Sequence, residues 1–126
     1  MDKKKILIID DEAAITKFLK MMLERSGRYN VQCESEGMKA VSSARSFGPD
    51  LILLDINLPD AQGGEVSAQL QDEPSLRNIP VVFLTGMVSP EEARAGLNIG
   101  GRPALSKPID MDRLVDCIEK NLPKNT

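Results

Sequence analysis

Three short runs of consecutive apolar residues constrain the fold of this chain more than any other feature. They lie at residues 6–9, 51–54 and 81–84, and all three are rich in branched side chains. Continuous apolar runs of this length are typical of strands that are buried on both faces of a parallel sheet. The sequence therefore predicts three central strands.

Two weaker strands are predicted at residues 30–34 and 103–106. In the first, Val31 and Cys33 alternate with polar residues and would face inward. The second begins with Pro103, which has no N–H to donate and is tolerated best in an edge strand. We therefore expect both weaker strands at the edges of the sheet.

Helical patterns follow the strands. Five helices are expected, at residues 15–23, 40–47 and about 64–71, from Ser89 onward, and from Asp110 onward. Gly27 and Gly48 follow the first two as stop signals. Ser89 with Pro90 behind it is a typical helix start, and Asp110 is a predicted N-cap of the last helix.

The order of these elements is β-α, five times over. Strict alternation indicates a parallel sheet with right-handed crossovers and helices on both faces. With the three strong strands in the centre, the predicted spatial order is 2-1-3-4-5. This is the order of a flavodoxin-like, doubly wound α/β fold, whose ligand crevice opens at the carboxyl ends of strands one and three. We expect one domain over residues 1–126.

Composition excludes several classes of function. The chain has 126 residues, 41% of them hydrophobic and 28% charged, with no apolar run near the roughly 20 residues that cross a bilayer. No signal peptide is readable, so a cytoplasmic location without membrane contact is expected. The net charge of −3 argues against direct nucleic-acid binding. The chain has no histidine, so catalysis by an imidazole is not expected. Cys33 and Cys117 are far apart in the sequence, so a zinc site is not expected either. Both cysteines are predicted to be small buried hydrophobes.

Polar residues follow four of the predicted strands at their carboxyl ends. These are Asp10 and Asp11, Asp55 and Asn57, Thr85, and Lys107. Because the carboxyl ends of parallel strands meet at one edge of the sheet, these side chains should converge on one crevice. Each residue alone has an ordinary structural explanation. The acidic residues at 11 and 12 could complement a helix dipole, Thr85 could be a plain strand residue, and Lys107 a surface charge.

Asp55 is harder to explain as structure. An aspartate that ends an apolar run should be partly buried, where an unpaired carboxylate costs several kcal/mol. Three carboxylates in one pocket, Asp10, Asp11 and Asp55, repel one another unless a cation offsets them. A hard divalent cation with oxygen ligands fits this need, and Mg²⁺ suits a site with few carboxylates and retained waters.

Four short motifs in the expected order resemble the receiver domains of two-component response regulators. They are Ile8-Ile9-Asp10-Asp11-Glu12, Leu53-Leu54-Asp55-Ile56-Asn57-Leu58-Pro59, Phe83-Leu84-Thr85-Gly86 and Ser106-Lys107-Pro108. The resemblance covers the chain from Lys5 to about Leu122. It implies a phosphoacceptor switch that catalyses only its own phosphorylation and dephosphorylation. The phosphoryl donor would be a sensor histidine kinase or a histidine phosphotransfer protein, and the signal would reach a downstream protein or an output domain.

The resemblance also implies a role for each site residue. Asp55 would be the phosphoacceptor and, with Asp11 and the main-chain carbonyl of Asn57, a ligand of Mg²⁺, for which Mn²⁺ can substitute. Asp10 would act on the metal through a bound water. Lys107 would pair with Asp55 and then with a phosphoryl oxygen, while Thr85 donates a hydrogen bond to that group. Gly86 would leave room for the donor, and the bond to Pro108 would be cis.

One position departs from the pattern. Receiver domains usually carry Tyr or Phe three residues before the lysine, and this chain has Ala104 there. We therefore expect the switch to act through movement of a loop and of the predicted fourth helix, with Met87 as a participant.

Three other classes of protein fit the sequence less well than a receiver domain does. A haloacid-dehalogenase-like phosphohydrolase needs an Asp-x-Asp motif and a cap region, whereas this chain has adjacent aspartates and is short. A flavodoxin needs a hydroxyl-rich phosphate loop where Asp10 and Asp11 stand. A degenerate receiver that only mediates protein contacts would not need the full set of site residues. No nucleotide-binding P-loop is present.

Overall fold

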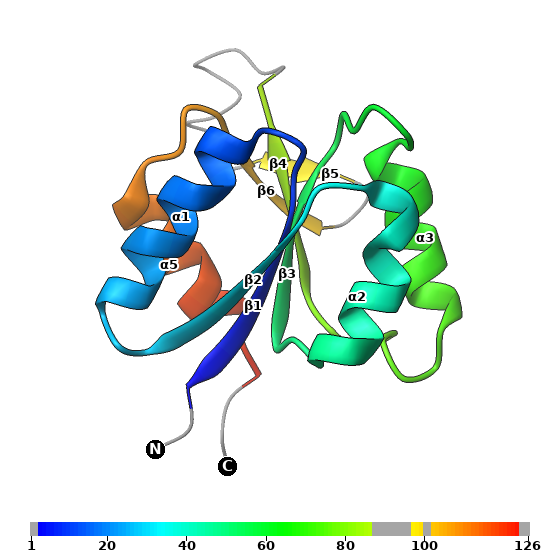
Figure 1. Cartoon of the computed structure of the whole chain (residues 1–126), viewed down its shortest axis with the longest axis horizontal. Helices are drawn as coiled ribbons and strands as arrows, with labels where there is room; N and C mark the ends of the chain where they lie inside the picture. Colours follow the sequence, from blue (N-terminus) through cyan, green and yellow to red (C-terminus); the bar gives the residue numbers. More distant parts are fainter. Residues whose placement is uncertain (1–2, 87–96, 100–101, 124–126) are drawn as a thin grey trace.

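One sheet organises the protein and carries helices on both faces (Figure 1). The computed structural model describes residues 3–86, 97–99 and 102–123. The strand order is β2-β1-β3-β4-β6-β5. The strands are β1 (Lys4–Ile9), β2 (Tyr29–Glu34), β3 (Leu51–Asp55), β4 (Val81–Thr85), β5 (Leu97–Ile99) and β6 (Arg102–Ser106). Five of them are parallel and follow the predicted order 2-1-3-4-5, with β6 as the fifth.

The edge beside β6 differs from the prediction. The short strand β5 pairs with β6 in antiparallel fashion, so β6 is not an edge strand. Pro103 lies before the stretch that pairs with β4, which begins at Ala104, and its partner in β5 is Asn98. β5 was not predicted, since three residues are too few to show a strand pattern.

Among the described residues, two pairs of α-helices cover the sheet. Figure 1 shows α1 and α5 over one face and α2 and α3 over the other. The bounds are α1 (Ala13–Arg25), α2 (Ala40–Phe47), α3 (Gly63–Asp72) and α5 (Met111–Asn121), with a short 3₁₀ helix η1 (Gly37–Lys39) leading into α2. These four helices confirm four of the five that were expected. The helix expected from Ser89 lies outside the described residues.

Local signals explain where the helices begin and end. The side chain of Asp110 accepts hydrogen bonds from the backbone N–H groups of Asp112 and Arg113, so the predicted N-cap of α5 is confirmed. Gly48 ends α2 in the left-handed region, with φ at 65°. A residue with a Cβ is strained in that conformation, so the glycine stops the helix.

The core has two layers because successive strand residues point to opposite faces of the sheet. Leu7, Ile52 and Phe83 pack under α2 and α3, while Ile8 and Leu53 pack under α1 and α5. All residues of β3 and β4 are buried, as expected for central strands of a parallel sheet.

The cysteine prediction was wrong for Cys33. Val31 is buried as expected, but Cys33 is exposed and Cys117 is only partly buried. β2 is the outermost strand on its side, so alternation along the strand does not guarantee cover for every inward position. Among the described residues, no helix is long and apolar enough to span a bilayer.

Candidate functional site

Two buried aspartates form the floor of the site. Asp10 directly follows β1, and Asp55 is the last residue of β3. The parallel register pairs Ile9 with Leu54, so both carboxylates emerge side by side at the carboxyl edge of the sheet. Asp10 is 2% exposed and Asp55 is 5% exposed. Two neighbouring carboxylates with so little water need a positive charge close by.

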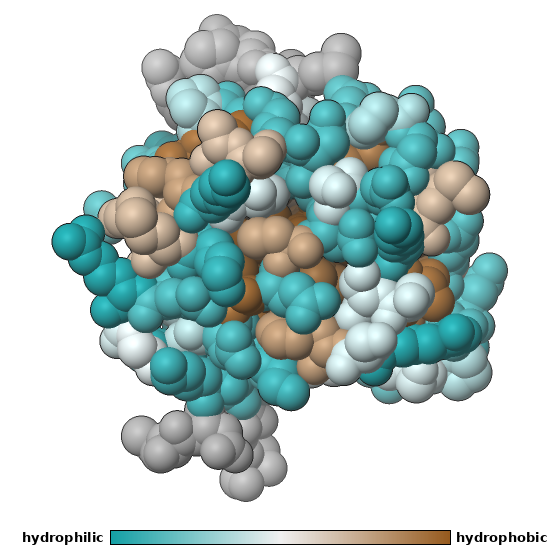
Figure 2. All heavy atoms as spheres, viewed as in Figure 1, coloured by the Kyte–Doolittle hydropathy of each residue, from teal (hydrophilic) through white to brown (hydrophobic). Residues whose placement is uncertain are grey.

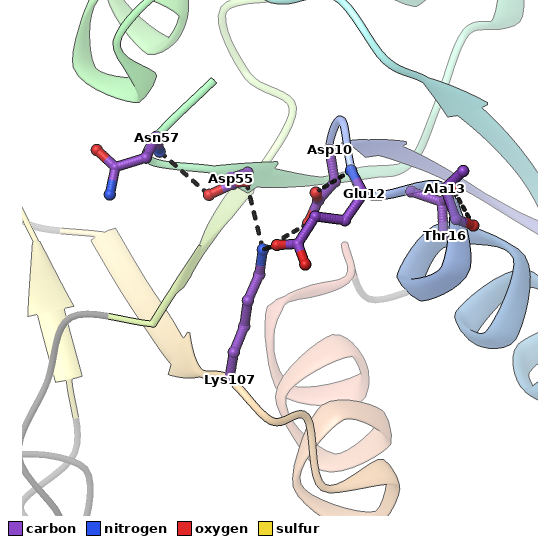
Figure 3. A network of polar contacts seen from close by, with 7 residues as sticks. All are labelled: Asp10, Glu12, Ala13, Thr16, Asp55, Asn57 and Lys107. Carbon is purple, nitrogen blue, oxygen red and sulfur yellow. Dashed lines mark hydrogen bonds and ion pairs between the residues drawn. The ribbon is translucent and has the colours of Figure 1, made fainter. Parts of the chain in front are cut away.

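Lys107 supplies that charge from the connection between β6 and α5. Its backbone N–H donates to the carbonyl of Thr85 at 2.8 Å, which anchors the segment to the end of β4. The side chain reaches into the crevice, where Nζ lies 2.9 Å from Asp10 Oδ2 and 3.3 Å from Asp55 Oδ2 (Figure 3). The Lys107–Pro108 peptide bond is cis.

Glu12 makes a contact with Lys107 that was not predicted from the sequence. Its Oε1 lies 2.7 Å from Lys107 Nζ, closer than either aspartate oxygen. Glu12 is the N-cap residue of α1, but its side chain makes no capping hydrogen bond and reaches across the crevice instead (Figure 3). The acidic residue beside Asp10 and Asp11 was visible in the sequence, but nothing in the spacing showed which way it points.

The surroundings of Asp55 disfavour the ionised form of its carboxylate. Burial raises the pKa of Asp55, and the negative charge of Asp10 raises it further. Lys107 and the N–H of Asn57 oppose this shift but do not cancel it. Burial lowers the pKa of Lys107, yet the contacts with Glu12 and Asp10 outweigh burial and leave it above its ordinary value. Lys107 is therefore a permanent ammonium ion in this site.

The acidic residues have the chemistry and spacing of a divalent-cation site. One carboxylate oxygen from each of Asp10, Asp11 and Asp55 lies within 4.8 Å of the others. Mg²⁺ binds oxygens at about 2.0–2.1 Å, so opposite ligands stand about 4.2 Å apart and small adjustments suffice. Asp10 Oδ2 is fully buried and accepts no hydrogen bond from any described residue; its contact is the ion pair with Lys107. A cation with oxygen ligands fits these residues.

The loop after β3 is held against the acceptor. The backbone N–H of Asn57 donates to Asp55 Oδ1 at 3.1 Å, while the Asn57 side chain points away from Asp55 (Figure 3). The loop closes through a bridge between Asn57 and Gln62 and through a 2.7 Å bond from the N–H of Gly63 to the carbonyl of Ile56. A Cβ on Gly63 would lie 2.7 Å from Ile56 Cα, so this close approach requires glycine.

Asp60 ties the same loop to a second surface element. Its two carboxylate oxygens accept hydrogen bonds from the backbone N–H groups of Gly37 and Met38, each at 2.9 Å. These bonds hold the pKa of Asp60 below its usual range. The loop that carries Asn57 and the 3₁₀ helix η1 are thus joined by one side chain.

The remaining predicted residues surround the crevice at different depths. An open pocket of about 390 Å³ is lined by Asp11, Glu12, Asp55, Asn57, Gly86 and Lys107. A Cβ on Gly86 would meet no described residue within 4 Å. Thr85 is buried at the end of β4, beneath the lining. Ala104 is also buried and pairs with Phe83 in the sheet.

Comparison with known proteins gives a consistent assignment. Residues 6–119 match the family model of the response regulator receiver domain. The polar-differentiation response regulator DivK of Brucella ovis is 34% identical over 119 residues, which cover 94% of this chain and 96% of that protein. The Vibrio cholerae chemotaxis protein CheY4 has a TM-score of 0.82 at 26% identity, covering 96% of this chain and 100% of that structure. The receiver domain of the sensor histidine kinase PA1611 from Pseudomonas aeruginosa, solved with magnesium in its active site cleft, has a TM-score of 0.76 at 24% identity, covering 95% and 98%.

Proposed function

Because the chain belongs to the response regulator receiver domain family, we propose that Asp55 accepts a phosphoryl group and that the chain, as one domain, works as a switch. The family is one of signalling switches rather than of classical enzymes. The observation that carries the proposal is the meeting of Asp55 with Lys107, from distant parts of the sequence, in an open pocket. A buried carboxylate with a permanent cation beside it is a nucleophile that can accept a dianionic group.

The proposed reaction is an in-line displacement at phosphorus. A carboxylate oxygen of Asp55 attacks the phosphorus of a phosphohistidine, the P–N bond breaks, and the imidazole nitrogen keeps the electron pair. The new P–O bond makes an acyl phosphate. The chain contributes mostly positioning and charge stabilisation. Lys107 would hold one phosphoryl oxygen, Thr85 would donate its hydroxyl hydrogen bond, and Gly86 would leave space for the donor.

Asp10, Asp11 and Asp55, with the carbonyl of Asn57, are the residues that we propose to hold Mg²⁺ or Mn²⁺. When bound, the ion would neutralise the carboxylates and polarise the phosphoryl oxygens. Two observations support this assignment. The three carboxylate oxygens lie close together, and the buried Asp10 Oδ2 accepts no hydrogen bond from a described residue. We propose that Asp10 acts through a water, since Lys107 holds its Oδ2 and the N–H of Glu12 donates to its Oδ1.

The proposed donor is a histidine kinase or a histidine phosphotransfer protein, which sets the site of action in the cytoplasm. A protein that brings phosphohistidine to Asp55 must cover the surface next to the pocket. There, a mostly apolar groove of about 300 Å³ runs between α1 and the segment after β6. Its lining is Ala14, Ile15, Phe18, Leu19, Pro108 and Ile109 together with Lys107. Figure 2 shows hydrophobic side chains gathered over α1, and Phe18 and Met21 are exposed.

Phosphorylation would change the protein by adding charge beside Thr85 and Lys107. We propose that the loops after β3 and β4 respond and that a downstream protein or an output domain reads the change. With Ala104 in place of the usual aromatic residue, the rotation of a ring cannot carry the signal at that position. The proposed route through the helix expected from Ser89 and through Met87 concerns residues outside the described ranges.

A phosphate-affinity gel after incubation with acetyl phosphate and Mg²⁺ tests the function. We expect a retarded band for the wild-type protein and for Asp72→Asn, which removes an exposed carboxylate at the far end of α3. Asp55→Asn should show none. A wild-type protein without a retarded band would indicate a module that only mediates contacts. Steady turnover of free phosphomonoesters would indicate a phosphohydrolase.

A further inference from the structure

The Lys107 ammonium lies within 3.3 Å of oxygens from three carboxylates. It donates hydrogen bonds to Glu12 Oε1 at 2.7 Å and to Asp55 Oδ2 at 3.3 Å, and it forms an ion pair with Asp10 Oδ2 at 2.9 Å. The ammonium is well enclosed, with 14% of the Lys107 side-chain surface exposed. A phosphoryl oxygen on Asp55 would be a fourth oxygen beside an enclosed ammonium that can donate only three hydrogen bonds, so one of the present partners has to give way.

The three partners differ in how easily they can leave. Asp10 Oδ2 is fully buried and depends on Lys107 alone among the described residues, so losing that contact would strand a buried charge. Asp55 cannot leave, because the phosphoryl group is attached to it. Glu12 has 53% of its side-chain surface exposed and would be rehydrated on leaving.

The backbone of Glu12 is fixed while its side chain is free to turn. The N–H of Glu12 donates to Asp10 Oδ1 at 2.9 Å, and its carbonyl accepts from Ile15 and Thr16 at the start of α1. Departure of the carboxylate therefore needs only rotations within the side chain, and both the helix and Asp10 keep their places. The negative charge of an arriving phosphoryl group would favour that departure through like-charge repulsion.

We infer that Glu12 is a positioning residue that occupies, in the unphosphorylated protein, the Lys107 N–H that a phosphoryl oxygen takes over. This inference rests on the proposed function of Asp55. Glu12 keeps the ammonium at the mouth of the pocket and competes with the phosphoryl group for it. The contact therefore lowers the affinity of the site for a phosphoryl group and sets how completely a given donor can switch the protein.

Beryllofluoride, which mimics a phosphoryl group on aspartate, tests the competition directly. Each variant is first titrated with Mg²⁺, and the beryllofluoride dissociation constant is then measured by NMR at saturating Mg²⁺. Glu12→Gln keeps the shape of the side chain but removes its charge, and we expect it to bind beryllofluoride about five- to tenfold more tightly. Asp72→Asn removes one charge far from the pocket and should bind as the wild-type protein does.

Glu12→Asp separates direct contact from a general field effect. The shorter side chain keeps the charge but falls short of Lys107, so its affinity should move toward that of Glu12→Gln. An unchanged or weaker affinity in Glu12→Gln overturns the inference, even if its melting temperature falls, because a helix-capping role alone would alter stability and not this affinity. If the wild-type protein fails to bind beryllofluoride, the proposed function fails and the inference with it. If the wild-type protein binds beryllofluoride and Glu12→Gln binds it with the same affinity, the inference about Glu12 fails while the proposed function stands.

Discussion

The ammonium nitrogen of Lys107 lies 3.3 Å from a carboxylate oxygen of Asp55, although 52 residues separate them in the chain. The contact exists because β3 and β6 end at the same edge of the sheet, one strand apart across β4. Lys107 also touches Asp10, so one ammonium partly neutralises two buried carboxylates. This arrangement opposes the rise in the pKa of Asp55 that burial causes, and it leads to the predictions below.

Asp55→Asn should stabilise the metal-free protein. Because the pKa of Asp55 is raised in the folded state, its ionisation makes the wild-type protein less stable as pH rises from about 4 through that raised value. The asparagine does not ionise. Its advantage in the free energy of unfolding should therefore be small near pH 4 and reach on the order of 1 kcal/mol at pH 7. Urea denaturation at both pH values in EDTA measures this, and an equal difference at the two pH values would contradict it.

Lys107→Ala should destabilise the metal-free protein by on the order of 3 kcal/mol, since it leaves the buried carboxylates of Asp10 and Asp55 unpaired. Saturating Mg²⁺ should restore stability more strongly in this variant than in the wild-type protein, because the cation replaces a missing charge. Thermal unfolding with Mg²⁺ and with EDTA measures both effects.

Lys20→Ala is the matched control for that experiment, because Lys20 pairs with Glu24 on α1 and touches no residue of the pocket. It should show the wild-type response to Mg²⁺. Equal responses in Lys107→Ala and in the wild-type protein would show that the metal and Lys107 do not share the same carboxylates.

Gly63→Ala should distort the loop that follows the acceptor. Its Cβ would lie 2.7 Å from Ile56 Cα and 3.0 Å from the carbonyl oxygen of Asp55, and neither backbone atom can move without shifting the site. We expect a loss of about 1–3 kcal/mol in stability and slower phosphorylation by acetyl phosphate. Gly64→Ala is its neighbour in the same helix and its Cβ would meet no atom of the described residues within 4 Å, so it should be neutral or slightly stabilising. Equal behaviour of the two variants would rule out the close packing.

Asp60→Ala should separate η1 from the loop after β3. The wild-type side chain accepts hydrogen bonds from the N–H groups of Gly37 and Met38, so changes near Asn57 can reach η1 through it. We expect beryllofluoride to shift these two amide resonances in the wild-type protein and to leave them nearly unchanged in Asp60→Ala. Persistence of the shifts in the variant would show that another path connects the two segments.

The sequence predicted those parts of the fold that depend on strong local patterns. The central strands β1, β3 and β4 are visible in the sequence as apolar runs. The N-cap role of Asp110 depends only on residues next to it in the chain, so it could be predicted as well. β5 and the exposure of Cys33 were not predictable in this way. Both depend on which element covers an edge of the sheet, and that is decided by distant packing.

The candidate site was predictable for a related reason. Strand ends of a parallel sheet meet at one edge, so locating the strands was enough to bring Asp10, Asp55 and Lys107 together. Glu12 and Asp60 were missed because their roles depend on side-chain direction in loops. The position of an acidic residue shortly after a strand does not reveal whether its carboxylate caps a helix or reaches across a crevice.

The central claim is that Asp55 itself becomes phosphorylated, and mapping the modified residue tests it most directly. The protein is incubated with acetyl phosphate and Mg²⁺, reduced with borohydride, which converts an aspartyl phosphate into homoserine, and digested for mass spectrometry. The account predicts homoserine at position 55 alone, dependent on both acetyl phosphate and Mg²⁺. Homoserine at Asp10 or Asp11, or an unmodified Asp55 under these conditions, would contradict it.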